Sequence, residues 1–234
     1  MAEIIYGGGG RSDCQQGFAV ASTMLSPAER RCLELAWTAW GRGTVPVGAV
    51  VTDAAGSVVF EGRSRMYDHE APPGELANSL LAHAEVNALA RLDPQARHEA
   101  LTLTTSLEPC PLCVGAVAMA TVGRLVYLGA DPYAGAVGLL QPTPHTSRVP
   151  LEVVGPRADA FGLLASAMHV AFFLGRRPDG HVVATHRRLA PAVVIAAEAL
   201  IDLGAPAAAA AGDPMPEELA GQLSGLTTTD HAGD

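Results

Sequence analysis

The chain has 234 residues, of which 49% are hydrophobic and 17% charged, a composition typical of a globular protein rather than a disordered or fibrous one. The longest uncharged helix-like stretch covers 160–175, short of the about 20 residues that a membrane-spanning helix needs. The chain opens with Met1-Ala2-Glu3, without the basic and apolar regions of a signal peptide, so we expect a cytoplasmic location.

The charge of the chain disfavours a long polyanionic partner. All 15 basic residues are arginine, and the 24 acidic residues bring the formal net charge to −9. Residues 178–234 hold 8 acidic residues and 2 arginines (net −6), which leaves a net charge of −3 for 1–177. Because phosphate binding draws its affinity from clustered cations, we expect a small-molecule substrate rather than a nucleic acid.

The first elements are predicted from residue 25 onward, since 1–24 contains four consecutive glycines and resembles a flexible tail. Ser26-Pro27-Ala28-Glu29 has the form of a capping box and predicts a helix that ends at Gly41. The β-rich segments 45–52 and 57–61 then indicate a hairpin, and a polar, proline-containing loop follows over 63–80.

Helices and strands alternate in the next hundred residues. The patterns predict a helix, a strand, a helix, two further strands and a long helix, over 81–92, 101–106, 111–121, 125–128, 149–154 and 158–174. Between the last two strands, the pattern of 131–148 indicates a loop with one helical turn. This alternation favours an α/β/α sandwich that opens with a hairpin.

The pattern weakens beyond residue 177. We expect a strand over 181–185, a helix over 192–203, an alanine- and proline-rich linker over 205–212 and a disordered acidic end. These expectations divide the chain into a flexible tail, one main domain and a C-terminal extension, with bounds 1–24, 25–177 and 178–234.

Two short motifs bring together residues that can bind a metal. His83-Ala84-Glu85 starts a predicted helix, and Pro109-Cys110-Pro111-Leu112-Cys113 lies at a strand-to-helix turn. Cysteines three residues apart share a helix face, and a helix N-terminus stabilises their thiolates. Two thiolates and one imidazole leave the fourth position of a tetrahedral zinc open, as in catalytic sites. Glu85 lies beside His83 and is placed to move protons.

Neither motif is specific when it stands alone. A C-x-x-C pair also occurs in thiol oxidoreductases and in half of a structural zinc site. A structural site needs two more ligands, but Cys14 and Cys32 lie 18 residues apart, in the predicted tail and the first helix. H-x-E followed by P-C-x-x-C is the signature of zinc-dependent deaminases. An oxidoreductase using Cys110 and Cys113 is the alternative of another class, and it leaves His83 without a role.

The segment 26–177 resembles the cytidine-deaminase-like superfamily, in particular the branch of tRNA adenosine, guanine and cytosine-type base deaminases. The matching segments follow in the expected order as Pro46–Val51, Ala82–Leu89, Ser106–Cys113 and Val126–Ala136. The resemblance implies a three-layer α/β/α sandwich with a central five-stranded mixed sheet, and usually a homodimer. It also implies one Zn²⁺ per chain on His83, Cys110 and Cys113, with Glu85 as the catalytic proton carrier.

The resemblance also implies four substrate contacts. Val47 and Ala49 would form a pocket wall, with Gly48 between them letting the backbone come close to the substrate. Ala84 would touch the base edge through its backbone. Ser64 stands where relatives commonly place an asparagine near the end of the second strand, so the identity of the substrate does not transfer directly.

Two departures from the tRNA-editing members bear on the substrate. Tyr133 stands where those relatives often carry a basic residue, and they tend to end in a basic helix, whereas this chain continues into an acidic extension. We therefore expect a guanine- or cytosine-type free base or nucleoside as the substrate. Deamination of adenosine in tRNA is the alternative within the same family.

Several further polar residues are expected to have no part in the chemistry, although those of the loop 66–80 could also line the pocket. In the loop 66–80 we expect four of them to be solvated, namely His69, Glu70, Glu75 and Asn78. We expect His145 to lie in a loop, His169 to be packed or at an interface, and the three histidines of the extension, His181, His186 and His231, to be exposed.

Overall fold

The computed structural model describes residues 24–140, 143–216 and 218–227. The expectations for the tail before residue 24, for His231 and for the last acidic residues lie outside this part of the chain.

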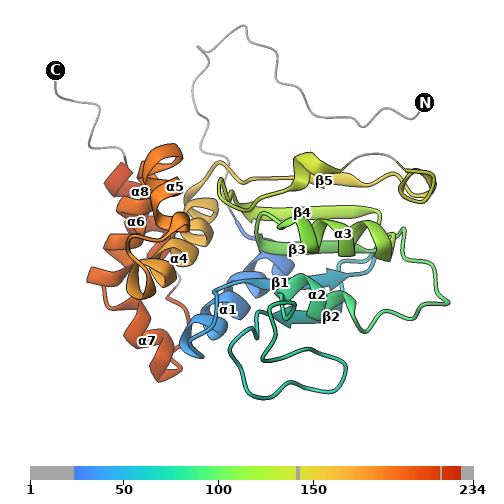
Figure 1. Cartoon of the computed structure of the whole chain (residues 1–234), viewed down its shortest axis with the longest axis horizontal. Coiled ribbons are helices and arrows are strands. Elements are labelled where there is room, and N and C mark those ends of the chain that lie inside the picture. The colour runs from blue at the N-terminus through green and yellow to red at the C-terminus, as the bar shows by residue number, and fades with distance from the viewer. Residues whose placement is uncertain (1–23, 141–142, 217, 228–234) are drawn as a thin grey trace, which may run out of the picture.

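The described residues contain one mixed sheet of five strands in the order β2-β1-β3-β4-β5 (Figure 1). The strands are β1 (Gly48–Thr52), β2 (Val58–Arg63), β3 (Thr102–Leu107), β4 (Arg124–Gly129) and β5 (Glu152–Val154). β1 pairs antiparallel with both β2 and β3, whereas β3–β4 and β4–β5 are parallel. The hairpin and the five-stranded mixed sheet are therefore confirmed.

Helices cover both faces of this sheet. α2 (Ala84–Leu89) and α3 (Pro111–Ala120) pack on one face, and α1 (Pro27–Gly41) and α4 (Ala160–Arg176) pack on the other. Side chains of β1 alternate accordingly, since Ala49 and Val51 belong to the α2–α3 side and Val50 to the α1 side. The three-layer α/β/α sandwich is confirmed, although α2 is shorter than the predicted 81–92.

Gly48 allows α1 to lie directly against β1. A Cβ atom at this position would stand 2.2 Å from the Cys32 carbonyl oxygen and 2.5 Å from the Leu35 Cβ. The side of Gly48 on which a Cβ atom would stand is therefore occupied by α1.

We expect Gly48→Ala to lower the free energy of unfolding by about 1–3 kcal/mol, because α1 must move away from the sheet. Urea denaturation measures the change. Gly115→Ala is the control, since a Cβ there meets no atom within 4 Å and alanine favours the helix α3. Equal effects of the two substitutions would contradict this account of Gly48.

The C-terminal extension folds into helices: α5 (His181–Leu189), α6 (Pro191–Asp202), α7 (Ala205–Ala211) and α8 (Leu219–Thr227). Three expectations are therefore wrong, namely the strand over 181–185, the linker over 205–212 and disorder throughout the acidic end. In α5 the buried residues Val183 and His186 are three apart, which is helical rather than alternating spacing.

The alanine-rich α7 packs against α1. Its small side chains let the backbones meet, and a Cβ on Gly41 would lie 2.1 Å from the Ala209 carbonyl oxygen. Trp37 Nε1 also donates a hydrogen bond of 2.8 Å to the Asp213 carbonyl oxygen, after α7. Contacts with α1 thus order the segment 205–212, which composition alone indicated to be a linker. No local sequence pattern indicates these contacts.

Helix α4 is apolar around most of its circumference because it lies between the sheet and the helices α6 and α8 (Figure 1). Among the described residues no single helix is long and apolar enough to cross a membrane, and only α6 and α7 together, bent by 57°, meet that test. The loop after β4 contains two short 3₁₀ turns, Val137–Leu139 and Thr146–Arg148, where the sequence predicted one turn.

Candidate metal centre and substrate cleft

The three predicted metal ligands lie at the N-termini of two neighbouring helices. His83 is the N-cap of α2, Cys110 is the N-cap of α3, and Cys113 lies in the first turn of α3. Pro111 occupies the first helical position, where its fixed φ favours starting the helix at this point. The free N–H groups and the positive end of α3 stabilise a thiolate there.

The donor atoms have the spacing of a tetrahedral zinc site. His83 Nδ1 lies 3.5 Å from Cys110 Sγ and 3.4 Å from Cys113 Sγ, and the two sulfur atoms are 3.6 Å apart. Zinc bonds of ordinary length place such donor atoms about 3.6–3.8 Å from one another. The three side chains form a metal-ligating cluster among the described residues, so the predicted Zn²⁺ fits here.

The two cysteines differ in acidity without a metal. Hydrogen bonding from Cys113, and then from His83, lowers the pKa of Cys110 to about 4, which makes it a thiolate at neutral pH. The hydrogen bond with Cys110, together with burial, raises the pKa of Cys113. Zinc binding therefore has to displace the proton of Cys113, and zinc affinity should fall as the pH is lowered.

Glu85 lies directly beside this cluster, in the first turn of α2. The residue is 3% exposed, and burial raises the pKa of its carboxyl group. Thr105 Oγ1 donates a hydrogen bond of 3.2 Å to Glu85 Oε1, and Cys113 Sγ lies 3.2 Å from Glu85 Oε2. A buried carboxyl group with a raised pKa is suited to holding and releasing a proton at neutral pH.

The ligands and Glu85 share a cleft whose empty volume, including its open mouth, is about 480 Å³. Of the predicted substrate contacts, Val47, Ser64 and Ala84 line this cleft. Ala49 does not line it: its side chain is fully buried between β1 and α2. Because side chains alternate along β1, the side chain of Ala49 points into the core.

Three acidic or basic residues of the cleft were not predicted. Glu108 and Asp131 follow the carboxyl ends of the parallel neighbours β3 and β4, and this placement at adjacent strand ends was a usable signal. His169 enters from α4, on the opposite layer from the metal ligands, and no local pattern indicated it. His186, which we expected to be exposed, is fully buried beside it.

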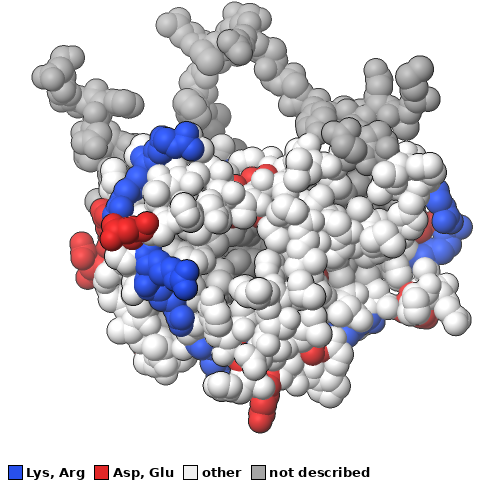
Figure 2. Space-filling model, in the orientation of Figure 1, with Lys and Arg blue, Asp and Glu red and all other residues white. Residues whose placement is uncertain are grey.

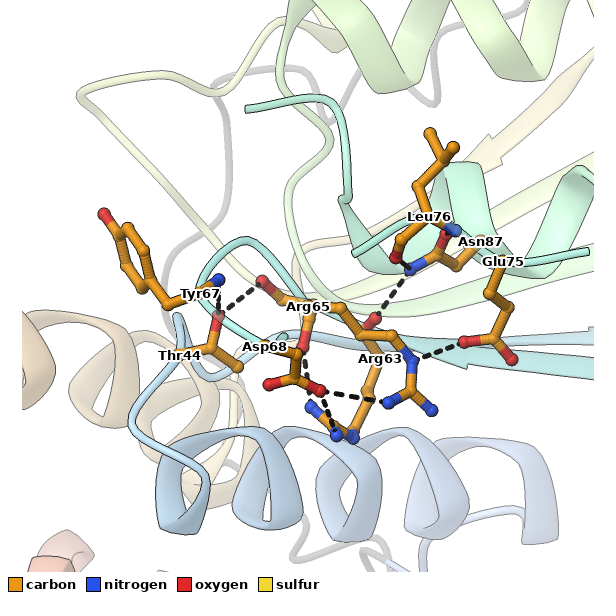
Figure 3. Close-up of polar contacts among 9 residues, drawn as sticks. Thr44, Arg63, Arg65, Tyr67, Asp68, Glu75, Leu76 and Asn87 are labelled. Carbon is orange, nitrogen blue, oxygen red and sulfur yellow. Dashed lines mark hydrogen bonds and ion pairs between the residues drawn. The ribbon is translucent and has the colours of Figure 1, made fainter. Parts of the chain in front are cut away.

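A network of ion pairs within the loop from Ser64 to His83, joined by Arg63 at the end of β2, fixes this loop (Figure 3). The Asp68 carboxylate contacts both Arg63 and Arg65, and Arg65 Nε lies 2.6 Å from Glu75 Oε2. The Glu75 side chain is only 6% exposed, so the expectation that it is solvated is wrong, because two arginines compensate its charge. His69, Glu70 and Asn78 are exposed, as expected.

Asn87 joins this loop to α2 with three hydrogen bonds (Figure 3). Its Oδ1 accepts from the Leu76 backbone N–H at 2.8 Å, and its Nδ2 donates to the carbonyl oxygens of Arg63 and Leu76. Arg63 immediately precedes Ser64 at the cleft, so Asn87 positions the start of the loop that forms one wall.

We expect Asn87→Leu to lower the free energy of unfolding by about 2 kcal/mol, because it leaves buried backbone groups without partners. Limited proteolysis should then cut within 64–83 earlier than in the wild type. Gln95→Leu, which changes an exposed amide in the same way, is the control. Unchanged proteolysis in Asn87→Leu would contradict the role of this amide.

Burial lowers the pKa of His169 to about 4, against an opposing effect of Asp131 and a smaller lowering by His186. Between pH 6.5 and about 4 the unfolded chain therefore binds a proton that the folded chain excludes. Stability is full above pH 6.5 and decreases as the pH falls through this window, by at most about 1.4 kcal/mol per pH unit from this group.

We expect His169→Phe to make the free energy of unfolding less dependent on pH. Urea denaturation at pH 7 and pH 5 measures the difference for each protein. His181→Phe, in which an exposed histidine of α5 is lost, should keep the wild-type dependence. The same slope in all three proteins would show that His169 does not contribute.

Comparison with known proteins now connects this geometry to a family. The chain matches the model of the cytidine and deoxycytidylate deaminase zinc-binding region over residues 24–129. It is 32% identical over 111 residues to the tRNA-specific adenosine deaminase of Rickettsia bellii, a match that covers 46% of this chain and 72% of that protein. The chain belongs to the cytidine and deoxycytidylate deaminase family. The resemblance carried by the motifs is thereby confirmed.

Two further matches of this deaminase family member cover only part of the chains compared. The tRNA(Ile)-lysidine synthase of Deinococcus radiodurans is 35% identical over 127 residues, which is 53% of this chain but 20% of that protein. The chain thus spans about a fifth of the length of that relative. A structure of guanine deaminase from Nitrosomonas europaea is 22% identical with a TM-score of 0.46, and the match covers 62% of this chain and 86% of that one.

Proposed function

We propose that this member of the deaminase family removes the exocyclic amine from a guanine- or cytosine-type free base or nucleoside by hydrolysis, with release of ammonia. The observation that carries the proposal is the Glu85 carboxyl group. It is buried, it is not paired with a basic side chain in the part of the chain described, and it lies 3.2 Å from one candidate zinc ligand.

The two oxygen atoms of Glu85 would have different tasks. Zinc on the three ligands would supply a water whose pKa is lowered to about 7. Thr105 holds Oε1 in place, which leaves Oε2, the oxygen nearer Cys113, to exchange protons. Glu85 Oε2 would accept one proton from the attacking water and pass it to the ring nitrogen as the water oxygen bonds to the amine-bearing carbon. It would then carry the second proton of that oxygen to the amine, so that the carbon–nitrogen bond breaks, ammonia leaves and a carbonyl group remains.

The lining of the cleft favours a substrate without a phosphate group. Three carboxyl groups line it, those of Glu85, Glu108 and Asp131, and no arginine is among the described lining residues. The whole sequence contains no lysine. In the view of Figure 2 the charged side chains lie mainly toward the edges of the molecule, and the middle of this face is largely uncharged. A free base or nucleoside therefore fits better than a nucleotide.

Deamination of adenosine in tRNA is the second candidate. The Rickettsia bellii relative carries that activity in its name. Exposed arginines also lie near the junction of α4 and α5, namely Arg176, Arg177, Arg187 and Arg188, and basic atoms gather in this region on the left of Figure 2. Clustered cations of this kind can contact a phosphate backbone.

The test is ammonia release from zinc-loaded protein supplied with free bases, nucleosides, mononucleotides and an anticodon stem-loop RNA. We expect release from a free base or nucleoside and none from the RNA. Release from the RNA alone would overturn the small-substrate proposal and favour the second candidate. A zinc-loaded protein that releases no ammonia from any member of the set would overturn both.

A further inference from the structure

His169 projects from α4 into the cleft that also contains the candidate zinc ligands. The residue is 7% exposed, and within the described residues neither of its ring nitrogens has a hydrogen-bond partner. Buried polar groups in folded proteins are nearly always paired, since an unpaired one is costly. An unpaired imidazole that faces a cleft is therefore a group whose partner is expected to be a ligand.

The imidazole of His169 is held from two sides. The Phe173 ring lies at 5.1 Å in an edge arrangement, and the His186 ring lies at 6.2 Å. His186 is itself fixed, since its Nδ1 donates a hydrogen bond of 2.9 Å to the Val182 carbonyl oxygen. Its Nε2 lies 3.9 Å from Asp131 Oδ1, another atom of the cleft lining. These neighbours position the His169 ring without satisfying its nitrogens.

His169 differs in hydrogen-bonding capacity from the other polar groups of the cleft. The carboxyl groups of Glu85, Glu108 and Asp131 mainly accept hydrogen bonds. Burial keeps His169 neutral at pH 7, so one ring nitrogen carries a proton to donate while no positive charge is added. A neutral N–H donor suits an uncharged acceptor such as a ring carbonyl oxygen, and it supplies no positive charge to balance a phosphate.

We propose that His169 is a specificity-determining residue whose imidazole N–H donates a hydrogen bond to a ring carbonyl oxygen of the substrate. This inference rests on the proposed function and names the residue that would recognise the oxo group of its substrate class. The substrate is an amino heterocycle that also carries an oxo group, as guanine and cytosine do. Adenine, which has an amine and no oxo group, lacks the carbonyl acceptor.

Binding to Glu85→Gln, which should hold zinc without turnover, tests the contact apart from catalysis. The ligands are two pairs that differ by the oxo group, guanine with 2-aminopurine and cytosine with 4-aminopyrimidine. Isothermal titration calorimetry gives a Kd for each. We expect the oxo member of at least one pair to bind about ten to a hundred times more tightly than its partner.

The same measurement on Glu85→Gln/His169→Phe should show this preference reduced to less than about threefold. His181→Asn in the Glu85→Gln background is the control for losing an exposed histidine, and it should keep the full preference. A preference that persists in the His169 variant, the absence of any preference, or no binding at all would each overturn the assignment.

Two further readouts separate this role from a structural one and from the proposed function itself. His169→Phe alone should keep its zinc and its unfolding temperature, because an unpaired buried polar group is replaced by an apolar ring. A loss of zinc or a lower unfolding temperature would instead indicate a structural role and overturn the assignment. If the oxo preference depends on His169 but wild-type protein releases no ammonia, the contact stands and the proposed reaction fails.

Discussion

Glu85→Gln should reduce ammonia release by about 10²–10⁴-fold, the usual contribution of a positioned general acid–base. Glutamine keeps the shape of the side chain and can still accept from Thr105 through its carbonyl oxygen, but it cannot take up or release the proton. The free energy of unfolding should stay the same or rise, because a buried carboxyl group with a raised pKa is replaced by a neutral amide. Steady-state ammonia assays on zinc-loaded protein measure the first effect.

The control for this prediction is Glu70→Gln, which makes the same change on an exposed residue of the loop that forms part of the cleft wall. It should retain activity within about twofold of the wild type. Zinc content, measured by elemental analysis, should be one ion per chain in both variants and the wild type. If Glu85→Gln keeps zinc and more than a tenth of the activity, another group carries the proton.

Loss of any zinc ligand should have an even larger effect, because it removes the metal and with it the reaction. We expect Cys110→Ala to hold less than a tenth of an ion of zinc per chain and to release no measurable ammonia. Without this ligand, the free energy of unfolding should no longer depend on the zinc concentration. Wild-type protein should gain about 3–4 kcal/mol of stability at a free zinc concentration 100 to 1,000 times its Kd, and Cys110→Ala should gain none.

Cys32→Ala provides a matched control, since Cys32 is a buried thiol that donates to the Thr104 carbonyl oxygen and lies outside the cleft lining. It should lose some packing stability but keep both zinc and the stabilisation by zinc. Denaturation with and without added zinc distinguishes the two cysteines. Full zinc content in Cys110→Ala would contradict this prediction, because it would show that the protein binds zinc at another site.

The metal centre was predictable from sequence because its residues follow local rules. Both H-x-E and P-C-x-x-C sit at helix starts, where a proline at the first helical position and the i, i+3 spacing of the cysteines fix their geometry within a few residues. The layers of the fold were predictable for a related reason, since the alternation of strands and helices is periodic along the chain.

The predictions from sequence were wrong or incomplete where packing between distant segments decides the structure. The segment 181–185 is short and β-branched, and only the burial of Val183 and His186 against other helices makes it part of α5. The alanine-rich α7 has no pattern of its own and is ordered by α1. His169 enters the cleft because α4 crosses the sheet near the ends of β3 and β4, which the sequence of α4 alone does not indicate.

The helices that follow α4 have a consequence for how this chain can be shortened and altered. They cover the outer side of α4, so a chain cut after residue 177 would expose a long apolar helix and leave the wall that carries His169 without its support. The hydrolytic groups come from residues 83–113, whereas this wall comes from residues 160–189. If the proposed roles hold, changes around His169 would alter which heterocycle is accepted while residues 83–113 keep the proposed reaction, so the two segments could be varied separately.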